Sequence, residues 1–488
     1  MNLAWQPWAM ASAEIIAAIV IVTGLAQTLF YVVQLVYAGI ALGTRPPISR
    51  ASALWRFYAD EAPGIALLAP AYNEEVTVVE SVKSLLALHY PDFEVLLIND
   101  GSKDRTLQVL IDEFGLSPVE RFYDLAVEHK PIRGLYASER LPRLLVVDKE
   151  NGGKSDALNA GINVARAPLF CSMDADSLLE PDALLRAVRP FVEEPTRTVA
   201  VGGTIRIANG SRIEGGRVLE VGMPKNLLAL IQIMEYLRAF LMARLALGKM
   251  QVLTVISGAF GLFRRQTVIA VGGYSHGTVG EDMELVVRLH RRLREQKISY
   301  RIEFIPEPVC WTEVPEDLKI LGRQRARWQR GALETFFRHK DMLFNPRYGR
   351  VGFIGFGQIL IVDVLGPLSE VLGYVLVPLL WALGLLSVDY LLAFIAVTFT
   401  LGIFVSVATL ILEEVELRRF PRARDLALLT SIAVIENFGY RQLSNFWRIR
   451  GWWQFLNKQQ GWGDMARKGF AVPAADKAKE GAAGGNAG

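Results

Sequence analysis

Hydrophobic and polar positions divide the chain into three parts. Ile15 to Leu42 is an apolar stretch without a charged side chain, and long apolar segments return only after Arg350. Between them, from Asp60 to Lys340, short apolar runs alternate with segments of helical periodicity. This alternation is typical of a mainly parallel sheet covered by helices. The pattern therefore predicts an α/β domain flanked by membrane helices.

The first apolar stretch is long enough to cross a bilayer core of ~30 Å. Arg45, Arg50 and Arg56 follow it closely, whereas no Lys or Arg precedes it. By the positive-inside rule, the N-terminus lies outside and the next domain lies in the cytoplasm. A cleaved signal peptide is the alternative, but its apolar region is shorter, ~7–15 residues, and follows a basic segment.

The apolar segments after Arg350 predict further membrane helices. Residues 351–388 form one long broken helix or two shorter ones, because Asp363, Pro367 and Glu370 interrupt them. Residues 391–412 form a clean span. The two acids, seven residues apart, can face the same way, and carboxylates inside a span normally point to a polar pathway.

Residues 426–443 are either a polar-lined span or a helix at the membrane interface, because they contain Glu436, Asn437 and Arg441. The basic residues before them indicate a cytoplasmic loop: Arg418, Arg419, Arg422 and Arg424.

We predict four regions. They are a transmembrane helix (1–44), a cytoplasmic domain ending in an amphipathic interface helix (45–340), C-terminal transmembrane and interface helices (341–450) and a cytoplasmic tail (451–488). The tail is rich in Ala, Gly and Lys from Ala471 onward, which is typical of disorder.

Four predicted strands of the cytoplasmic domain end in polar loops, which should meet at one edge of the sheet. The strands are 65–69, 93–98, 144–147 and 169–172. The polar residues that follow them are Tyr72, Asn73 and Glu75, then Asp100, then Lys154 after two glycines, and finally Asp174 and Asp176.

Each loop suits one part of a nucleotide diphosphate. Asp174 and Asp176 can hold Mg²⁺ or Mn²⁺, which clamps a diphosphate. The backbone before Lys154 can approach a phosphate, with the lysine as countercharge. Asp100 can accept hydrogen bonds from a uracil N–H or ribose hydroxyls. Any one of these loops alone is more often a plain turn, but together they describe a nucleotide-diphosphate site.

Two further segments carry candidate chemistry. Ser257 and Gly258 are small enough to let a ligand approach the backbone. Gly280, Glu281 and Asp282 open a predicted helix, where acidic residues also serve as simple caps.

On the next predicted helix, Gln324, Arg327 and Trp328 share one face. Arg327 can bind diphosphate oxygens in a bidentate manner, and Trp328 can stack on a sugar ring. The neighbouring basic residues would also suit a helix lying on anionic lipid, so both roles can coexist. These residues are Arg323, Arg325 and Arg330.

The order of these motifs resembles the membrane-embedded, processive family-2 inverting glycosyltransferases, which include cellulose, hyaluronan, chitin and poly-N-acetylglucosamine synthases. The similarity covers roughly Ile65 to Arg330, and the Gln324–Trp328 block is its most specific element. The resemblance implies a GT-A (Rossmann-like) fold, a UDP-sugar donor, a Mg²⁺ or Mn²⁺ ion and extrusion of a growing polysaccharide through the membrane helices.

The resemblance also implies roles for single residues. Asp282 would be the general base. The UDP-binding residues would be Tyr72, Asn73, Glu75, Asp100, Lys154, Asp174 and Arg327. The acceptor-binding residues would be Ser257, Gly258, Glu281, Gln324 and Trp328. The metal ligands would be Asp174 and Asp176.

The chain also departs from several members of that family. Gly280 stands where cellulose synthases usually have Thr, and Met283 stands where chitin and hyaluronan synthases usually have Arg. The segment from Ser257 to Arg265 is most similar to bacterial poly-N-acetylglucosamine synthases. Whether the donor is UDP-N-acetylglucosamine or UDP-glucose stays open, as does the linkage.

Two other functions remain as alternatives. One is a membrane transferase that adds a single sugar to a lipid or short acceptor, and the other is a polysaccharide exporter or receptor with a degenerate enzyme domain. The net charge of +3 is too small to indicate nucleic-acid binding, and the two cysteines need no disulfide. The resemblance places the chain in the bacterial inner membrane, where accessory export proteins are possible partners.

Overall fold

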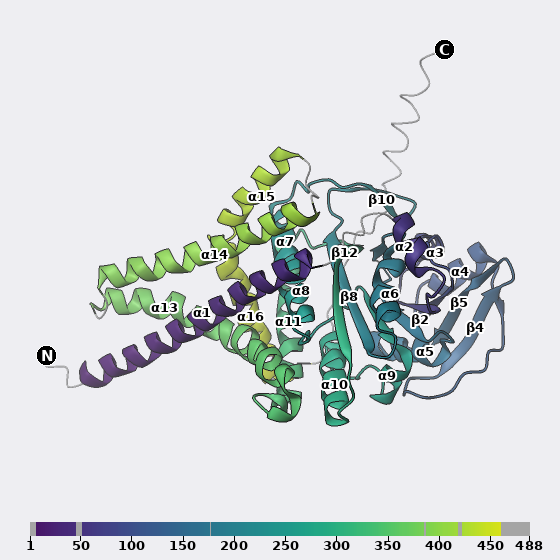
Figure 1. Cartoon of the computed structure of the whole chain (residues 1–488), viewed down its shortest axis with the longest axis horizontal. Coiled ribbons are helices and arrows are strands. Elements are labelled where there is room, and N and C mark those ends of the chain that lie inside the picture. The colour runs from purple at the N-terminus through teal and green to yellow at the C-terminus, as the bar shows by residue number, and fades with distance from the viewer. Residues whose placement is uncertain (1–5, 45–50, 176, 385–386, 418–421, 460–488) are drawn as a thin grey trace, which may run out of the picture.

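The structure is a computed structural model of the whole chain, and it describes residues 6–44, 51–175, 177–384, 387–417 and 422–459. An α/β body lies at one end of the molecule, and long helices project from it (Figure 1). The projecting helices include α1 (Gln6–Gly43), α13 (Gly366–Ala382) and α14 (Val388–Leu417). Both long apolar segments therefore contribute helices that project from the α/β body.

A ten-stranded mixed sheet forms the centre of the body, in the order β3-β4-β5-β2-β1-β6-β11-β8-β12-β7. The central strands β5, β2, β1 and β6 run parallel to one another, and β11 is antiparallel to both of its neighbours. The strands are β1 (Ile65–Ala71), β2 (Phe93–Asp100), β3 (Ser117–Pro118), β4 (Ile132–Ser138), β5 (Leu141–Lys149), β6 (Leu169–Ser172), β7 (Leu178–Leu179), β8 (Thr198–Ile207), β11 (Gly261–Arg264) and β12 (Arg301–Thr312). The expected mainly parallel sheet is present at the centre.

Helices cover the sheet and carry the motifs that follow it. They include α3 (Val78–Leu86), α4 (Thr106–Phe114), α5 (Lys154–Val164), α6 (Ala183–Glu193), α10 (Glu281–Glu295) and α11 (Leu318–Arg338). A further helical stretch consists of α7 (Leu227–Tyr236), the π-helix η1 (Leu237–Arg244) and α8 (Leu245–Lys249).

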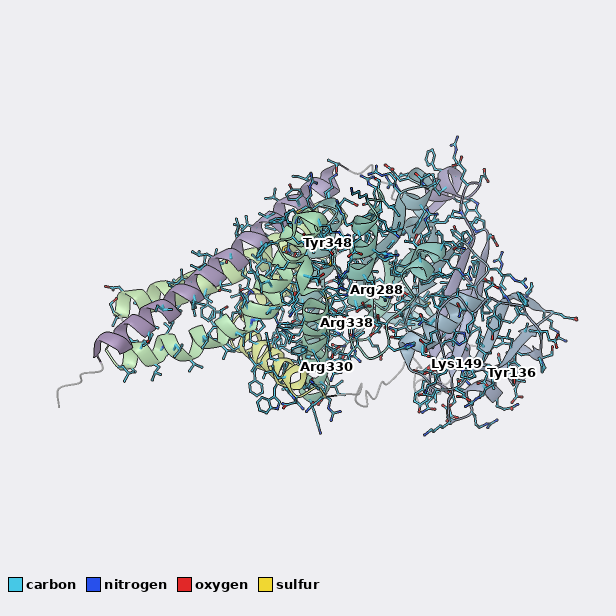
Figure 2. The ribbon with its side chains drawn as sticks, turned by 90° about the horizontal axis from the view of Figure 1, so that it is seen from below. Tyr136, Lys149, Arg288, Arg330, Arg338 and Tyr348 are labelled. Carbon is cyan, nitrogen blue, oxygen red and sulfur yellow. The ribbon has the colours of Figure 1, made fainter. Side chains whose placement is uncertain are left out.

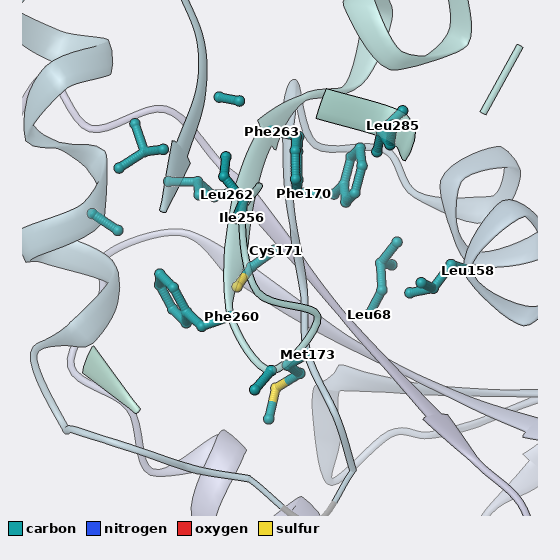
Figure 3. Packing of buried hydrophobic residues seen from close by; sticks show 14 of the residues in the cluster. Leu68, Leu158, Phe170, Cys171, Met173, Ile256, Phe260, Leu262, Phe263 and Leu285 are labelled. Carbon is teal, nitrogen blue, oxygen red and sulfur yellow. The ribbon is translucent and has the colours of Figure 1, made fainter. Parts of the chain in front are cut away.

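One continuous hydrophobic core joins the sheet to α10. Phe170 of β6 and Phe263 of β11 stack with ring centroids 5.4 Å apart, and Leu285 of α10 lies close to them (Figure 3). All three side chains are almost completely buried. The helix that begins at Glu281 is therefore anchored on the same sheet as the strand-end loops.

Three of the four predicted strands, β1, β2 and β5, are longer than the apolar pattern predicts. In β2 and β5 the extension at the carboxyl end consists of polar residues that take part in the ladder. β2 continues to Asp100 and β5 continues to Lys149, and the two strand ends pair in parallel. The amide of Asn99 donates to Asp148 Oδ1 at 2.6 Å. A polar residue can lie inside a sheet when its neighbour on the next strand provides the partner, so hydrophobicity alone ends these strands too early.

Among the described residues, three helices are long and apolar enough to span a membrane: Ala18–Gly43, Val351–Ala382 and Thr398–Val415. This identifies the chain as a membrane protein. The second span is one broken helix, not two, and combines η4 (Val351–Gly355), α12 (Phe356–Gln358), η5 (Ile359–Leu365) and α13.

Residues 426–443 are neither a single span nor a single interface helix. Helix α15 (Ala423–Ile435) ends before Glu436, and α16 (Tyr440–Leu456) begins after Gly439, whose φ is 96°. Glycine adopts such a backbone without a Cβ clash, so the chain turns there. Arg45, Arg50, Arg418, Arg419 and the tail from residue 460 lie outside the described residues.

Candidate active site

A cavity of about 2090 Å³ opens between the sheet edge, α10, α11 and the membrane helices. It brings together most of the predicted site residues: Tyr72, Asn73, Lys154, Asp174, Ser257, Gly258, Glu281, Asp282, Gln324, Arg327 and Trp328. Glu75 and Asp100 are not among its lining residues. Asp176 lies outside the described residues.

Asp100 braces the glycine loop beside the cavity. Its carboxylate is 4% exposed and accepts hydrogen bonds from the backbone N–H groups of Gly152 and Gly153, at 3.0 and 2.8 Å. Lys149 donates to Oδ1 of Asp100 at 2.7 Å. With these partners in place, Asp100 shapes the loop in front of Lys154.

Lys149 is itself fully buried between two carboxylates, Asp100 at 2.7 Å and Asp156 at 2.5 Å. Figure 2 shows Lys149 among the strands, on the side of the molecule away from the membrane helices. The sequence pattern did not identify Lys149 and Asp156 as functional. Their signal was weak: a lysine that ends an apolar strand, and an acid in the first turn of the next helix.

Asn73 and Glu75 tie the loop after β1 to the loop after β2. The side chain of Asn73 accepts from the N–H of Lys103 at 2.8 Å, and its own N–H donates to Ser102 Oγ at 3.0 Å. Glu75 accepts from the N–H of Arg105 at 3.0 Å. Both side chains therefore hold neighbouring strand ends in register.

Lys154 connects the strand-end loops to the loop of Ser257 and Gly258. Its ammonium lies 2.5 Å from Asp174 Oδ1 and 3.9 Å from Glu281 Oε1, and it donates to the Gly258 carbonyl at 3.4 Å. Burial lowers the pKa of Lys154, but Asp174 and Glu281 outweigh this effect and raise it overall. A Cβ on Gly258 would lie 2.7 Å from Nζ of Lys154, so a larger residue there would displace the ammonium.

Asp282 is presented to the cavity by two backbone donors. The N–H of Met283 donates to Oδ1 at 2.8 Å and that of Gly258 to Oδ2 at 3.1 Å. Beside it, burial raises the pKa of Glu281 to about 7, although Lys154 pulls it down. The two adjacent acids thus differ in environment: Asp282 is partly exposed and Glu281 is buried.

Helix α11 presents Gln324, Arg327 and Trp328 to the cavity, as the shared face predicted. Trp328 is 46% exposed, so one ring face is available to a ligand. Burial lowers the pKa of Arg327, while Glu281, Asp174 and Asp282 act in the opposite direction. Positive charge is therefore held close to the three carboxylates.

The expected contact of Arg325 and Arg330 with lipid is wrong, because both side chains are buried. Arg325 forms an ion pair with Glu235 at 2.5 Å, and its guanidinium lies 4.3 Å from the centre of the Trp328 ring. A stacked cation of this kind stabilises an aromatic ring in one orientation. Arg325 is therefore a support for Trp328 that the sequence pattern did not identify.

The described residues fit a divalent cation held mainly by phosphate. No group of three or more His, Cys, Asp or Glu side chains in the described part of the chain could form an all-protein metal cage. Mg²⁺ bound with phosphates needs only one or two carboxylates. Asp174 lines the cavity with its side chain 31% exposed, and it would supply one such carboxylate.

The cavity continues among the membrane helices. Its lining there includes Gln27, Tyr31 and Gln34 of α1, Asp363 and Glu370 of the second span, and Arg448 of α16. The carboxylates have partners: Arg448 lies 3.4 Å from Asp363, and Asn445 donates to Glu370. Polar side chains thus lie along the cavity from Asp282 into the membrane part of the molecule, among apolar ones.

Residues 67–272 match the family described as Glycosyl transferase family 2. A poly-beta-1,6-N-acetyl-D-glucosamine synthase of Staphylococcus epidermidis is 30% identical over 278 residues, and one of Staphylococcus aureus is 31% identical over 280 residues. Each match covers 57% of this chain and 57% of the relative, so the chain spans a little over half the length of these curated relatives. Residues 67–272 are therefore similar to a family-2 glycosyltransferase domain, and the resemblance to poly-N-acetylglucosamine synthases is confirmed.

The fold has a solved counterpart in the mannosyltransferase PcManGT from Pyrobaculum calidifontis, determined in complex with GDP-Man and Mn²⁺. The TM-score is 0.54, with 17% sequence identity over 91% of this chain and 100% of that one. At this identity the likeness concerns the fold. The expected class, a GT-A domain with transmembrane helices, is confirmed.

Proposed function

We propose that this chain is an inverting membrane glycosyltransferase that polymerises a β-linked polysaccharide from a UDP-sugar and passes it into the membrane. The observation that carries the proposal is the single cavity, which joins the strand-end loops and Asp282 to polar residues of the membrane helices. A transferase that adds one sugar to a short acceptor has less need of such an extension.

In this proposal, Asp282 is the general base. Its carboxylate removes the proton of the acceptor hydroxyl as that oxygen attacks the anomeric carbon, so configuration inverts without a covalent intermediate. The N–H groups of Met283 and Gly258 hold the carboxylate in place, which keeps the base oriented before the acceptor arrives.

The donor lies along the strand-end loops. Tyr72 and Asn73 line the nucleotide side of the cavity. The glycine loop braced by Asp100 faces the diphosphate, and Glu75 holds the neighbouring loop after β2. Lys154 and Arg327 neutralise the departing diphosphate. Asp174, with Asp176, would hold Mg²⁺ or Mn²⁺, which supplies charge neutralisation at the leaving group.

The acceptor lies against Ser257, Gly258, Glu281, Gln324 and Trp328. The ring face of Trp328 contacts sugar C–H groups without selecting one register, which suits a chain that advances after each addition. UDP-N-acetylglucosamine is the preferred donor in this proposal, supported by the names of the staphylococcal relatives. We place the protein in the bacterial inner membrane with its catalytic domain in the cytoplasm, where accessory export proteins are possible partners.

A product-length assay tests this function. Purified protein in detergent is incubated with Mg²⁺ or Mn²⁺ and radiolabelled UDP-N-acetylglucosamine or UDP-glucose, each separately. We expect long products from UDP-N-acetylglucosamine. Products that stop at one added sugar would favour the single-addition transferase, and no transfer from either donor would refute the proposal.

A further inference from the structure

The second membrane span contains a π-helix, η5, at the point where it passes the acceptor helix α11. Asp363 lies in η5, and four positions later stands Pro367. In an α-helix the carbonyl of residue 363 would accept from the N–H of residue 367, but proline has none. The sequence therefore leaves one carbonyl of the membrane span without its usual backbone partner.

Side chains from two other helices bond the carbonyls of this turn. Gln329 of α11 donates through Nε2 to the carbonyl of Asp363 at 2.5 Å. Arg448 of α16 donates to the preceding carbonyl, Val362, at 2.7 Å, and Trp452 of α16 donates to the following one, Val364, at 3.3 Å. Three successive carbonyls of the span are thus bound by α11 and α16.

Two of these three donors, Gln329 and Arg448, are also joined to each other. Arg448 Nε donates to Gln329 Oε1 at 2.8 Å, so the amide of Gln329 uses both its donor and its acceptor. Gln329 is 4% exposed and directly follows Trp328. We call this linkage of Gln329, Arg448 and the η5 carbonyls the α11–span bridge.

Close packing keeps α11 and α16 from shifting independently. A Cβ on Gly451 of α16 would lie 2.6 Å from the carbonyl oxygen of Ala326, and a Cβ on Gly322 of α11 would lie 2.6 Å from Trp447 Nε1. Glycine at both positions allows the helix backbones to approach closely. The bridge therefore connects two closely packed helices to the membrane span.

We propose that Gln329 and Arg448 are positioning residues for elongation, which hold the acceptor helix in line with the membrane span so that sugar leaving Trp328 enters the membrane part of the cavity. Both residues line the cavity at this passage. The proposal rests on the function proposed above, because only a transferase that makes a polymer needs this alignment.

Gln329→Leu removes both bonds of the amide, and Arg448→Ala removes the other half of the bridge. We expect each change to lower the mean product length by about tenfold, with the KM for the UDP-sugar donor unchanged, because a small misplacement of the acceptor slows each further addition. Arg450→Ala is the matched control, since Arg450 is an exposed arginine on the same helix. It should leave product length unchanged.

A second variant distinguishes two roles of Gln329. One is to hold α11 against the membrane span, and the other is only to provide a donor for the Asp363 carbonyl. Pro367→Ala restores a backbone N–H for the Asp363 carbonyl but no link to α11. We expect Gln329→Leu combined with Pro367→Ala to make short products still. Recovery of full length in the double variant would overturn the proposal, because Gln329 would then only satisfy an orphaned carbonyl.

Two results distinguish failure of this inference from failure of the proposed function. Wild-type protein that forms no polymer refutes the function itself. Wild-type protein that forms polymer, beside a well-folded Gln329→Leu variant that forms polymer of equal length, refutes only the bridge. Elution as a single species and an unchanged thermal transition establish that the variants are folded.

Discussion

The proposed donor side of the cavity, at the strand-end loops, and its proposed acceptor side, at α11, are built from different kinds of contact. On the donor side, the functional loops follow four adjacent parallel strands, and their side chains bond the backbone of the next loop, as Asn73 does with Lys103. On the acceptor side, helices from distant parts of the chain meet, and individual polar pairs hold them, such as Arg325 with Glu235 and Gln329 with the Asp363 carbonyl.

Because of this difference, the two sides should respond differently to the loss of a single side chain. The sheet positions the donor loops through many backbone bonds, so most single side chains there can be lost without moving the loops. The acceptor side depends on buried polar groups with few partners. Removing one partner leaves the other unsatisfied at a cost of about 1–3 kcal/mol.

The largest effect is expected at Asp282, where the two sides meet. Asp282→Asn should lower turnover by at least ~100-fold, because an amide cannot take the acceptor proton. UDP binding, measured by calorimetry, should be preserved, since the donor loops do not depend on Asp282. If Asp282→Asn kept more than about a tenth of the wild-type rate, Asp282 would not be the general base.

On the donor side, the largest loss of stability is expected when Lys149 is replaced. Lys149→Met leaves Asp100 and Asp156 buried without their cation, and the loss of one partner from a buried ion pair costs about 3–5 kcal/mol. We expect a lower thermal transition and weaker metal-dependent UDP binding. Lys83→Met is the control, because the Lys83 ammonium pairs with Glu113 on the surface, where both side chains are more than 40% exposed, and such pairs contribute little to stability.

The pH dependence of stability sharpens the comparison at Glu281. Because burial raises its pKa to about 7 in the folded protein, the unfolded state releases this proton first as the pH rises from the ordinary glutamate value. Wild-type stability should therefore fall, relative to Glu281→Gln, across the interval between about pH 4.5 and 7, by on the order of 3 kcal/mol.

Thermal unfolding of both proteins at a series of pH values measures this difference. The fall in wild-type stability relative to Glu281→Gln should be nearly complete by pH 7, where Glu281 also ionises in the folded protein. Parallel stability curves for the wild type and the glutamine variant would contradict the buried, protonated state of Glu281.

The smallest effect should arise from Trp328, on the acceptor side alone. Trp328→Ala removes a stacking face worth about 0.5–1.5 kcal/mol, so products should become shorter while UDP affinity stays the same. Gel separation of radiolabelled product measures this. Full-length product at the normal rate would mean that the acceptor does not lie on Trp328. A transferase that adds a single sugar would then be the better supported function.

The sequence by itself predicted the parts that depend on short-range pattern. The apolar runs located β6 at its observed bounds, and a spacing of three and four residues placed Gln324, Arg327 and Trp328 on one helical face. Because parallel strands end at one edge of a sheet, strand direction alone predicts that Asp174 and Lys154 lie close together, and the two side chains do form an ion pair. Periodicity and strand direction depend on residues that are close in the sequence, so both can be predicted from the sequence alone.

Only the tertiary structure decided which distant groups meet. The basic residues of α11 have the composition of a lipid-facing helix, yet Arg325 lies against Trp328 because Glu235, ninety positions earlier, is packed beside it. The unpaired carbonyl of Asp363 is implied by Pro367, but nothing local selects Gln329 as its donor. A buried polar group takes whichever partner the packing brings within hydrogen-bond distance, and packing is set by the whole fold, not by the sequence around any one residue.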